Sequence, residues 1–338
     1  MSSPSEKCFK LGMVAKQILE NNKGILAADE SPGSIQKRFD KLGIINNEET
    51  RRSFRELLFT SEGIEKYIGG VILHEETFEQ KDESEKLFID MLKEKGICLG
   101  IKLDKGLIDY KNNEKVSVGL EDLHLRVKYY CSKGAVFAKW RSLFIVKGDN
   151  PTEDCIYENC TVLAKYAKIC QNNNLVPIVE PEVYFEGNYT IDEAEQQSKR
   201  ILSTLIQKLN IYEVYIPAVI IKMSFVTQGK ENKRICKPHE VGRTTMNTLV
   251  SAIPCGIPGI VFLSGGHTQD DAISYLNAIN KCKAYKTWSL SFSYGRCLSE
   301  KPMETWRGIE ENKKAAQREF IEIARRCHLA CRGDLEEE

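Results

Sequence analysis

The sequence predicts an α/β protein built as a single (β/α)8 TIM barrel. The prediction rests on chain length, on the number of short apolar segments, and on their alternation with helix-periodic segments. The chain has 338 residues, a length that suits one such barrel or two smaller domains. Because no low-complexity linker or change in composition divides it, we expect one domain over residues 1–338.

Eight short segments rich in apolar and β-branched residues are predicted strands. Strands that are apolar on both faces are typical of parallel sheets covered by helices. A closed barrel is therefore favoured, and an open doubly wound sheet is the competing architecture. The eight segments are 24–29, 69–75, 98–104, 135–141, 176–182, 214–222, 258–265 and 288–294.

Helices are predicted between these strands. Apolar residues at 87, 88, 91 and 92 share one helical face, and Gly96 is placed to end that helix. Thr190 and Glu193 predict a capping box at the start of another helix. A further helix is expected before the first strand, and the apolar stripe at 316, 320, 323 and 327 predicts a long C-terminal helix.

Composition excludes several classes of partner. Lys and Arg total 48, as do Asp and Glu, so the chain lacks the basic excess that nucleic acids or anionic membranes require. No apolar run approaches the roughly 18 residues of a membrane helix, and residues 1–10 lack the apolar part of a signal peptide. We therefore expect a cytoplasmic protein whose 12 cysteines are reduced and packed in the core.

Charged residues end several predicted strands at a spacing of two, which places their side chains on one face. In a barrel, the inward faces converge at the C-terminal mouth, where barrel enzymes hold their active sites. The residues are Asp29, Lys102, Asp104, Lys139, Arg141, Glu180, Glu182 and Lys222.

Each of these residues also has a plainer explanation when taken alone. Lys222 could reach solvent from a strand end, and Glu180 and Glu182 could lie in a solvated loop. Residues 139–141 could form a cation–aromatic surface patch, and residues 29–31 could cap a helix. Their joint occurrence at one rim favours a catalytic site instead.

These groups suit carbonyl chemistry. A lysine among other cations has a lowered pKa, and its neutral amine can attack a carbonyl. The resulting iminium withdraws electrons from the adjacent carbon–carbon bond, and a carboxylic acid that exchanges protons completes a lyase. Lys222 or Lys139 is the candidate amine, Glu180 or Glu182 the acid, and Asp29 the base.

The last two strands are followed by a predicted phosphate site. Ser264 and Gly265 follow the seventh strand, and Gly295 and Arg296 follow the eighth, where many barrels bind phosphate. Ser-Gly-Gly by itself favours an ordinary turn, and Arg296 after the next strand is what makes a phosphate site the better interpretation. Lys102 and Arg141 could bind a second phosphate across the mouth.

No metal or cofactor is expected. The five histidines form neither His-x-His nor His-Glu-x-x-His. Cys327 and Cys331 lie one helical turn apart, a spacing that core packing explains better than zinc.

Eight motifs together resemble those of the class I, Schiff-base-forming fructose-bisphosphate aldolase family. They occur in the family's order, and the resemblance extends from about Cys8 to Cys331. The resemblance implies a (β/α)8 glycolytic enzyme that cleaves fructose 1,6-bisphosphate to dihydroxyacetone phosphate and glyceraldehyde 3-phosphate without a metal. The motifs are GILAADES (24–31), GGVIL (69–73), GIKLDKG (100–106), FAKWR (137–141), VPIVEPE (176–182), FLSGG (262–266), LNAINK (276–281) and SYGR (293–296).

The resemblance implies a role for each catalytic candidate. Lys222 matches the lysine that forms the Schiff base, and this favours it over Lys139, which matches the cation beside the imine. Glu180 matches the general acid/base and Glu182 a second carboxylate of the same cluster. Asp29 matches the aspartate at the hydroxyl whose deprotonation starts cleavage.

The resemblance also implies two phosphate sites. One comprises Ser264, Gly265, Gly295 and Arg296, and the region of the other comprises Ser31, Ser34, Lys102 and Arg141. Two departures stand near these sites: the family's Lys-Pro-Asn-Met is replaced by residues 222–225, Lys-Met-Ser-Phe, and Pro32 replaces a threonine. Neither removes a group that the reaction needs.

The end of the sequence differs from the family, whose mobile tail closes with a tyrosine that helps exchange the carbanion proton. Here the last tyrosine is Tyr294 and residues 336–338 are glutamates. We therefore expect slower proton exchange, or exchange through water or another side chain. The family further implies a homotetramer, and a cytoskeletal moonlighting partner is an additional hypothesis.

Two other functions are compatible with the residues. A transaldolase-like or deoxyribose-phosphate-type lyase would not need two phosphate sites. A non-catalytic scaffold would not need Lys222, Glu180 and Asp29 together. The sequence does not rank fructose 1,6-bisphosphate against fructose 1-phosphate.

Overall fold

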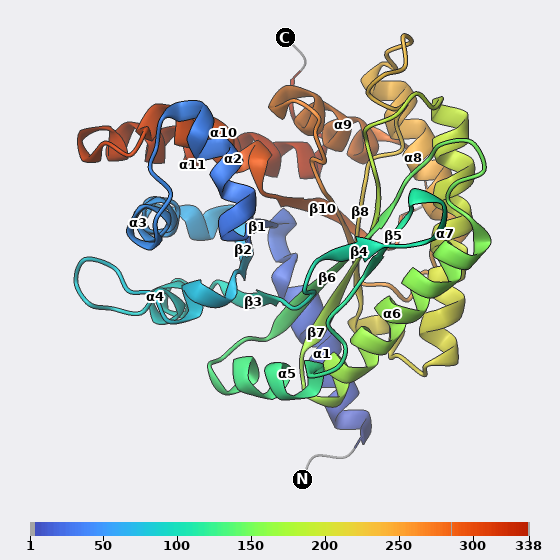
Figure 1. Ribbon diagram of the computed structural model, residues 1–338, viewed down its shortest axis with the longest axis horizontal. Coiled ribbons are helices and arrows are strands. Elements are labelled where there is room, and N and C mark those ends of the chain that lie inside the picture. The colour runs from blue at the N-terminus through green and yellow to red at the C-terminus, as the bar shows by residue number, and fades with distance from the viewer. Residues whose placement is uncertain (1–3, 285, 337–338) are drawn as a thin grey trace.

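Eight parallel strands close into a barrel in the computed structural model, which describes residues 4–284 and 286–336 (Figure 1). Neighbouring strands follow the order β1-β10-β9-β8-β7-β6-β3-β2. The predicted (β/α)8 barrel is confirmed, and the open sheet is wrong. The strands are β1 (Gly24–Ala28), β2 (Ile68–Leu73), β3 (Cys98–Lys102), β6 (Phe137–Phe144), β7 (Val176–Val183), β8 (Ile220–Met223), β9 (Gly259–Phe262) and β10 (Ser289–Tyr294).

Helices surround the barrel (Figure 1). Gly96 adopts the left-handed conformation just after α4, and Thr190 and Glu193 form the predicted capping box of α7. The helices are α1 (Pro4–Ile18), α2 (Pro32–Leu42), α3 (Glu48–Phe59), α4 (Phe88–Glu94), α5 (Leu123–Ser132), α6 (Glu153–Asn172), α7 (Ile191–Ile211), α8 (Pro238–Ala252), α9 (Gln269–Lys281), α10 (Arg296–Trp306) and α11 (Lys313–Arg332).

Some element boundaries differ from prediction. The segment predicted as a strand over 214–222 forms a 3-10 turn at Ile216–Ala218 before β8 begins at Ile220. Pro217 lies in that turn and has no backbone N–H for a strand ladder. A hairpin of β4 (Leu107–Asp109) and β5 (Lys115–Ser117) lies outside the barrel order and was not predicted.

The barrel interior is packed at its N-terminal end. α1 packs Leu11, Ala15 and Ile18 against inward-facing apolar residues of the strands. The ring of Phe137 occupies the space beside Gly100, where a Cβ would lie 2.2 Å from the ring. The charged side chains predicted for the site lie beyond this apolar floor, at the opposite, C-terminal end of the barrel.

The larger apolar core lies between the strands and the surrounding helices. Within the described residues, no helix is both long enough and apolar enough to cross a bilayer. Glu336 is the last described residue, and the predicted chain end at 337–338 lies outside this part of the chain.

Candidate active site

A cavity of about 280 Å³ opens at the C-terminal mouth of the barrel. Every residue given a catalytic or substrate-binding role lines it, and the structure therefore brings together residues from β3, β6, β7 and β8 and from the segments that follow β1, β9 and β10. These residues are Asp29, Ser31, Ser34, Lys102, Lys139, Arg141, Glu180, Glu182, Lys222, Ser264, Gly265, Gly295 and Arg296. Asp104, also predicted at the mouth, does not line the cavity and is buried beside Lys102 instead.

Strand alternation places the charged side chains inside the barrel. On β7, Val176 and Ile178 belong to the interior apolar cluster, and Glu180 and Glu182 continue the same face into the cavity. Both carboxylates are buried within the strand, so the solvated-loop explanation is wrong. Lys222 is only 4% exposed, and its solvent-reaching explanation is wrong as well.

Lys139 lies between two carboxylates. Its Nζ donates to Oδ2 of Asp29 over 2.6 Å and lies 3.2 Å from Oε2 of Glu180. Burial by itself lowers the pKa of Lys139, but the charges of Asp29, Glu180 and Asp104 outweigh it and raise that pKa. Lys139 therefore stays an ammonium and is unsuited to be the attacking amine. Its neighbour Trp140 is fully buried, so the cation–aromatic surface patch considered for residues 139–141 does not form.

Lys222 contacts the other oxygen of Glu180, with Nζ 3.1 Å from Oε1. Glu180 thus joins the two lysines, one at each carboxylate oxygen. Since Lys139 remains charged, the geometry favours Lys222 as the nucleophile, with a proton acceptor already in contact with its nitrogen.

Asp29 follows directly after β1 and is buried. Burial raises its pKa, but Lys139, Lys222 and Lys102 together lower it to about 2. The side chain is therefore a carboxylate at neutral pH and presents oxygen acceptors to the cavity.

The cations predicted for one phosphate region are paired. Arg141 forms an ion pair with Glu182, and its pKa is raised because this carboxylate outweighs the effect of burial. Lys102 Nζ lies 2.7 Å from Oδ1 of Asp104. An incoming phosphate would therefore compete with carboxylates for these two cations, which makes their rearrangement part of binding.

Ser31 and Ser34 complete this region from the β1–α2 loop. Ser31 caps α2 by accepting from the backbone N–H of Ser34, and the two hydroxyl oxygens lie 3.0 Å apart. The helix-cap explanation is thus right for Ser31, which also lines the cavity. Pro32 begins α2, a position that suits its fixed φ and missing donor.

The other predicted phosphate site lies at the start of α10. Gly295 is the N-cap of this helix and contributes no side-chain cap, so the amides of the first turn can face an anion. Gly265 and Gly266 have φ of 53° and 122°, a left-handed region that suits glycine. Arg296 adds a cation at the same place.

Ser293 lines the cavity and was missed by the sequence analysis. It is 1% exposed, and its Oγ has no hydrogen-bond partner among the described residues. Its position two residues before Gly295 in the SYGR motif could have indicated that Ser293 lies on the same face of the chain as the predicted phosphate site. Ala27, Glu30 and Leu263 also line the cavity and were not predicted for it.

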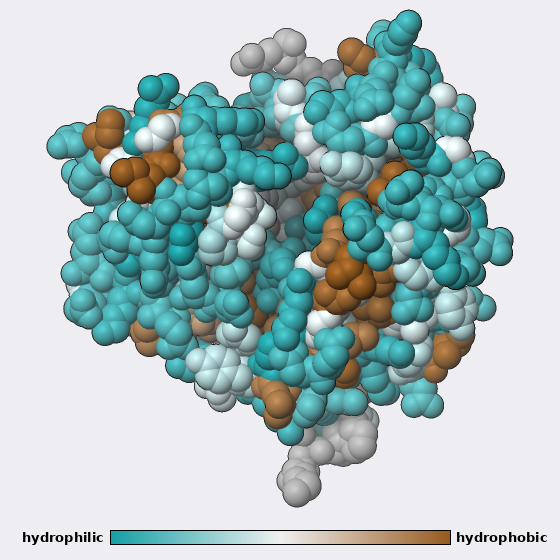
Figure 2. All heavy atoms as spheres, viewed as in Figure 1, coloured by the Kyte–Doolittle hydropathy of each residue, from teal (hydrophilic) through white to brown (hydrophobic). Residues whose placement is uncertain are grey.

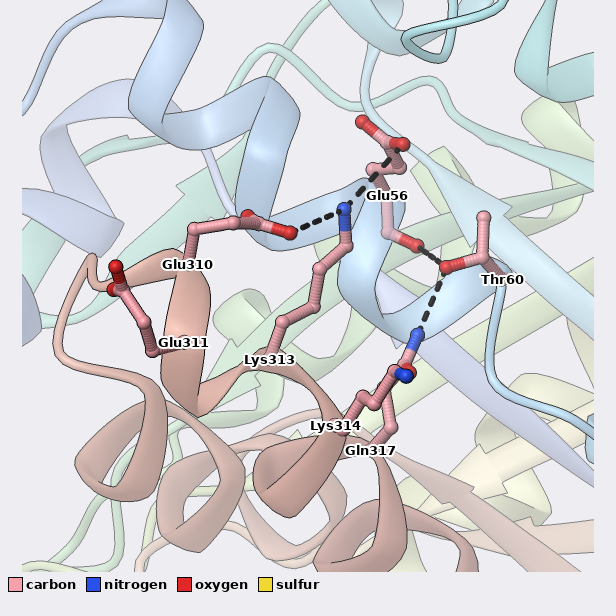
Figure 3. Close-up of a pocket in the computed structure, with 7 residues that line it drawn as sticks. All are labelled: Glu56, Thr60, Glu310, Glu311, Lys313, Lys314 and Gln317. Carbon is pink, nitrogen blue, oxygen red and sulfur yellow. Dashed lines mark hydrogen bonds and ion pairs between the residues drawn. The ribbon is translucent and has the colours of Figure 1, made fainter.

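A second hollow lies between α3 and α11, away from the barrel mouth (Figure 3). Lys313 lies 3.2 Å from Oε1 of Glu310 and 3.6 Å from Oε1 of Glu56, and Gln317 donates to Thr60. These contacts join two helices. Burial lowers the pKa of Lys313, but Glu310 and Glu56 outweigh it and raise that pKa, so Lys313 stays an ammonium. Within residues 4–284 and 286–336, no group of three or more His, Cys, Asp or Glu side chains is placed to hold a metal ion.

The chain is similar to fructose-bisphosphate aldolases in each of the comparisons with known proteins. The family model described as fructose-bisphosphate aldolase class-I matches residues 10–338. The chain is 57% identical over 325 residues to a fructose-bisphosphate aldolase of Encephalitozoon cuniculi, covering 96% of this chain and 95% of that protein. It is 44% identical to cytosolic fructose-bisphosphate aldolase 4 of Arabidopsis thaliana, covering 94% and 82%.

A solved structure of fructose-bisphosphate aldolase from Plasmodium falciparum, in complex with TRAP and a small-molecule inhibitor, is similar to the whole chain. The TM-score is 0.97 at 38% sequence identity, with 100% of this chain and 98% of that chain covered. The similarity therefore extends over the entire barrel and is not limited to the motifs at its mouth.

Proposed function

Because the chain belongs to the class-I fructose-bisphosphate aldolase family, whose reaction is the reversible cleavage of fructose 1,6-bisphosphate, we propose that Lys222 forms a Schiff base with the ketose carbonyl. The single observation that carries this assignment is the contact of Lys222 and the charged Lys139 with opposite oxygens of Glu180. In this arrangement Lys222 is the amine, Lys139 is the cation, and Glu180 is the proton carrier that both lysines contact.

Glu180 moves the protons of Schiff-base formation. The ammonium of Lys222 passes a proton to Oε1 of Glu180, and the neutral amine adds to C2 of the sugar. Glu180 first protonates the carbonyl oxygen to a hydroxyl, then takes a second proton from the attached nitrogen and gives it to this hydroxyl, which leaves as water as the iminium forms. Lys139 stays charged and holds the carboxylate in place.

Asp29 begins the cleavage. Its carboxylate accepts the proton of the C4 hydroxyl as the C3–C4 bond breaks, and the bonding electrons move into the iminium to give an enamine. The lysines lower the pKa of Asp29 to about 2 and make it a weak base, so the movement of electrons into the iminium supplies the driving force for this proton transfer. The proton on Asp29 then passes by way of Lys139 to Glu180, which protonates the enamine at C3, and water hydrolyses the resulting iminium to release the second product. Glu182 holds Arg141 beside this path.

The two phosphate sites suit the two ends of the sugar. β8 carries Lys222 and neighbours β9, and β9 neighbours β10, so the C1 phosphate belongs with Ser264, Gly265, Gly295 and Arg296. The C6 phosphate, four carbons from C2, then belongs with Ser31, Ser34, Lys102 and Arg141. Two separate sites favour a bisphosphate over the substrate of a transaldolase-like lyase.

Borohydride trapping tests the assignment. Reduction in the presence of dihydroxyacetone phosphate should leave a mass adduct on Lys222, and the Lys222→Met variant should carry none. An adduct on another lysine, or none on the active protein, would overturn the role of Lys222. Loss of activity in a chelator would indicate a metal-dependent reaction instead.

Assembly and location are further parts of the proposal. A cytoplasmic homotetramer is supported by the family, by a relative named cytosolic, and by exposed apolar residues such as Ile108 and Leu125. Figure 2 shows such residues gathered in separate patches on a mostly hydrophilic face. Mass photometry should give four times the chain mass of 38.5 kDa, and a monomer would contradict it.

A cytoskeletal partner beside catalysis is the remaining part of this proposal, and it rests on family likeness. Co-sedimentation of the protein with polymerised filaments should deplete it from the supernatant. Equal amounts in the supernatant with and without filaments would overturn the hypothesis.

A further inference from the structure

Two arginines and a glutamate outside the cavity are linked by hydrogen bonds to the loop that carries Asp29 and Ser31. We call Arg51 and Arg55 of α3, together with Glu76, the Glu76 cluster; Glu76 lies in the turn Glu75–Phe78 that follows β2. Arg51 binds the Glu76 carboxylate through Nε and Nη2, each over 2.8 Å. Arg55 donates to the same carboxylate.

The cluster is held rigidly. The side chain of Arg55 is 4% exposed and that of Glu76 is 19% exposed. Burial raises the pKa of Glu76, but the two arginines outweigh it and lower that pKa to about 2. A bidentate pair with a carboxylate that is charged at neutral pH fixes the plane of the Arg51 guanidinium, which directs its remaining donors.

The remaining N–H groups of Arg51 and Arg55 connect to the β1–α2 loop through two sets of hydrogen bonds. Arg55 Nη2 donates to the backbone carbonyl of Glu30 over 3.4 Å. Arg51 Nη1 donates to Oδ1 of Asn46 over 2.9 Å, and Asn46 Nδ2 donates to the carbonyl of Pro32 over 3.0 Å. The two carbonyls flank Ser31, whose hydroxyl lines the cavity.

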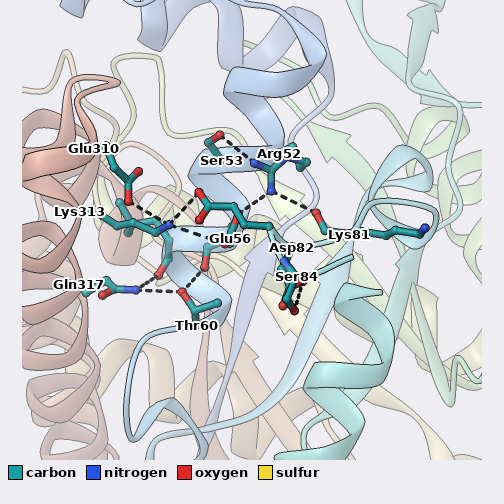
Figure 4. Close-up of polar contacts among 12 residues, drawn as sticks. Arg52, Ser53, Glu56, Thr60, Lys81, Asp82, Ser84, Glu310, Lys313 and Gln317 are labelled. Atoms are coloured by element: carbon teal, nitrogen blue, oxygen red, sulfur yellow. Dashed lines mark hydrogen bonds and ion pairs between the residues drawn. The ribbon is translucent and has the colours of Figure 1, made fainter. Parts of the chain in front are cut away.

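A second cluster of charged residues on α3 holds this helix to its neighbours but, among the described residues, has no hydrogen bond or ion pair with the β1–α2 loop (Figure 4). Arg52 pairs with Glu56, Glu56 lies 3.6 Å from Lys313 of α11, and Arg52 also donates to the carbonyl of Lys81. None of these contacts reaches the β1–α2 loop. Glu56 therefore offers a matched control: a buried, ion-paired glutamate on α3, the helix that carries Arg51 and Arg55.

We propose that Glu76 is a positioning residue for the C6 phosphate: it orients Arg51 and Arg55, which hold the carbonyls on both sides of Ser31. It thereby raises the preference of the enzyme for fructose 1,6-bisphosphate over fructose 1-phosphate. This inference rests on the proposed function, because it assigns Ser31 and Ser34 to the C6 phosphate.

The test compares Glu76→Gln with Glu56→Gln on both sugars. Glu76→Gln should raise KM for the bisphosphate about tenfold, since a small displacement of a binding loop is costly, and leave kcat/KM for fructose 1-phosphate within about twofold. Glu56→Gln should keep the wild-type ratio of the two kcat/KM values. An equal loss on both sugars, or the same change of ratio in Glu56→Gln, would overturn the proposal.

A second variant covers the case in which Glu76→Gln does not fold. Asn46→Ala removes the route to Pro32 without leaving a buried charge alone, and should lower the ratio in the same direction by about threefold. A folded Asn46→Ala protein with an unchanged ratio would overturn the proposal. Failure of the wild type to trap dihydroxyacetone phosphate on Lys222 would instead overturn the proposed function.

Discussion

Lys222 Nζ lies 3.1 Å from Oε1 of Glu180, deep in the barrel mouth. The same carboxylate has its other oxygen 3.2 Å from Lys139. Two lysines that look alike in the sequence therefore occupy different electrostatic positions. Lys139 also binds Asp29, and these carboxylates raise its pKa and keep it an ammonium, whereas the ion pair of Lys222 among the described residues is with Glu180.

Replacing Lys139 should abolish most of the activity even though the proposed nucleophile, Lys222, is retained. Lys139→Met removes the cation between Asp29 and Glu180, so we expect kcat to fall by about 100-fold or more. The pKa of Asp29 should rise, because Lys139 is the main charge that lowers it. Steady-state kinetics across pH checks both effects, and a variant with more than a tenth of wild-type kcat would contradict the assigned role.

Acid should weaken the fold partly through Asp29. Its pKa is about 2 in the folded protein against 3.8 for the ordinary group, so its contribution is present above pH 4 and is lost as the pH falls towards 2. The shift corresponds to about 2 kcal/mol of unfolding free energy. Urea unfolding between pH 6 and 3 should show a shallower pH dependence for Asp29→Asn, and an unchanged slope would refute this.

The ion pairs of Lys313 should matter for stability alone. Lys313 is 17% exposed and contacts Glu56 and Glu310, so Lys313→Met should lower the unfolding free energy by about 1 kcal/mol. The adjacent exposed Lys314→Met is the matched control and should change it little. Activity on fructose 1,6-bisphosphate should stay at the wild-type level, and a fall in kcat/KM would show that α11 influences the site.

Gly100 should tolerate no larger side chain. A Cβ at this position would lie 2.2 Å from the ring of Phe137, so Gly100→Val should destabilise the barrel by about 3 kcal/mol. Gly33→Ala, where nothing lies within 4 Å of the new Cβ, is the control. Thermal unfolding compares the two, and partial rescue of Gly100→Val by Phe137→Leu would identify the ring as the cause.

Much of the fold was predictable because barrel strands carry a strong signal. Buried parallel strands need apolar side chains on both faces, and this pattern located all eight. The alternation of two then placed Glu180 and Glu182 on one face, and the structure has both in the cavity. The strand boundary near Pro217 was missed, because an apolar composition does not distinguish a strand from the 3-10 turn that precedes it.

The Glu76 cluster was not predictable in the same way. Glu76 lies 25 residues from Arg51 and 21 from Arg55, and no periodic pattern links them. Ser293 was missed for a related reason, since a serine in a strand has no charge to mark its face. The tertiary structure shows the contacts of the Glu76 cluster and shows that Ser293 faces the cavity.

The sequence by itself determined which chemical groups meet at the barrel mouth. Their positions at strand ends follow from a local period of two, which any strand obeys. Only the tertiary structure decided how charge is divided among them: Lys139 is fixed as a cation by Asp29 and Glu180, while Lys222 has a proton acceptor beside it. That division depends on burial and on distances between residues far apart in the chain, because electrostatic energies are set by geometry in three dimensions.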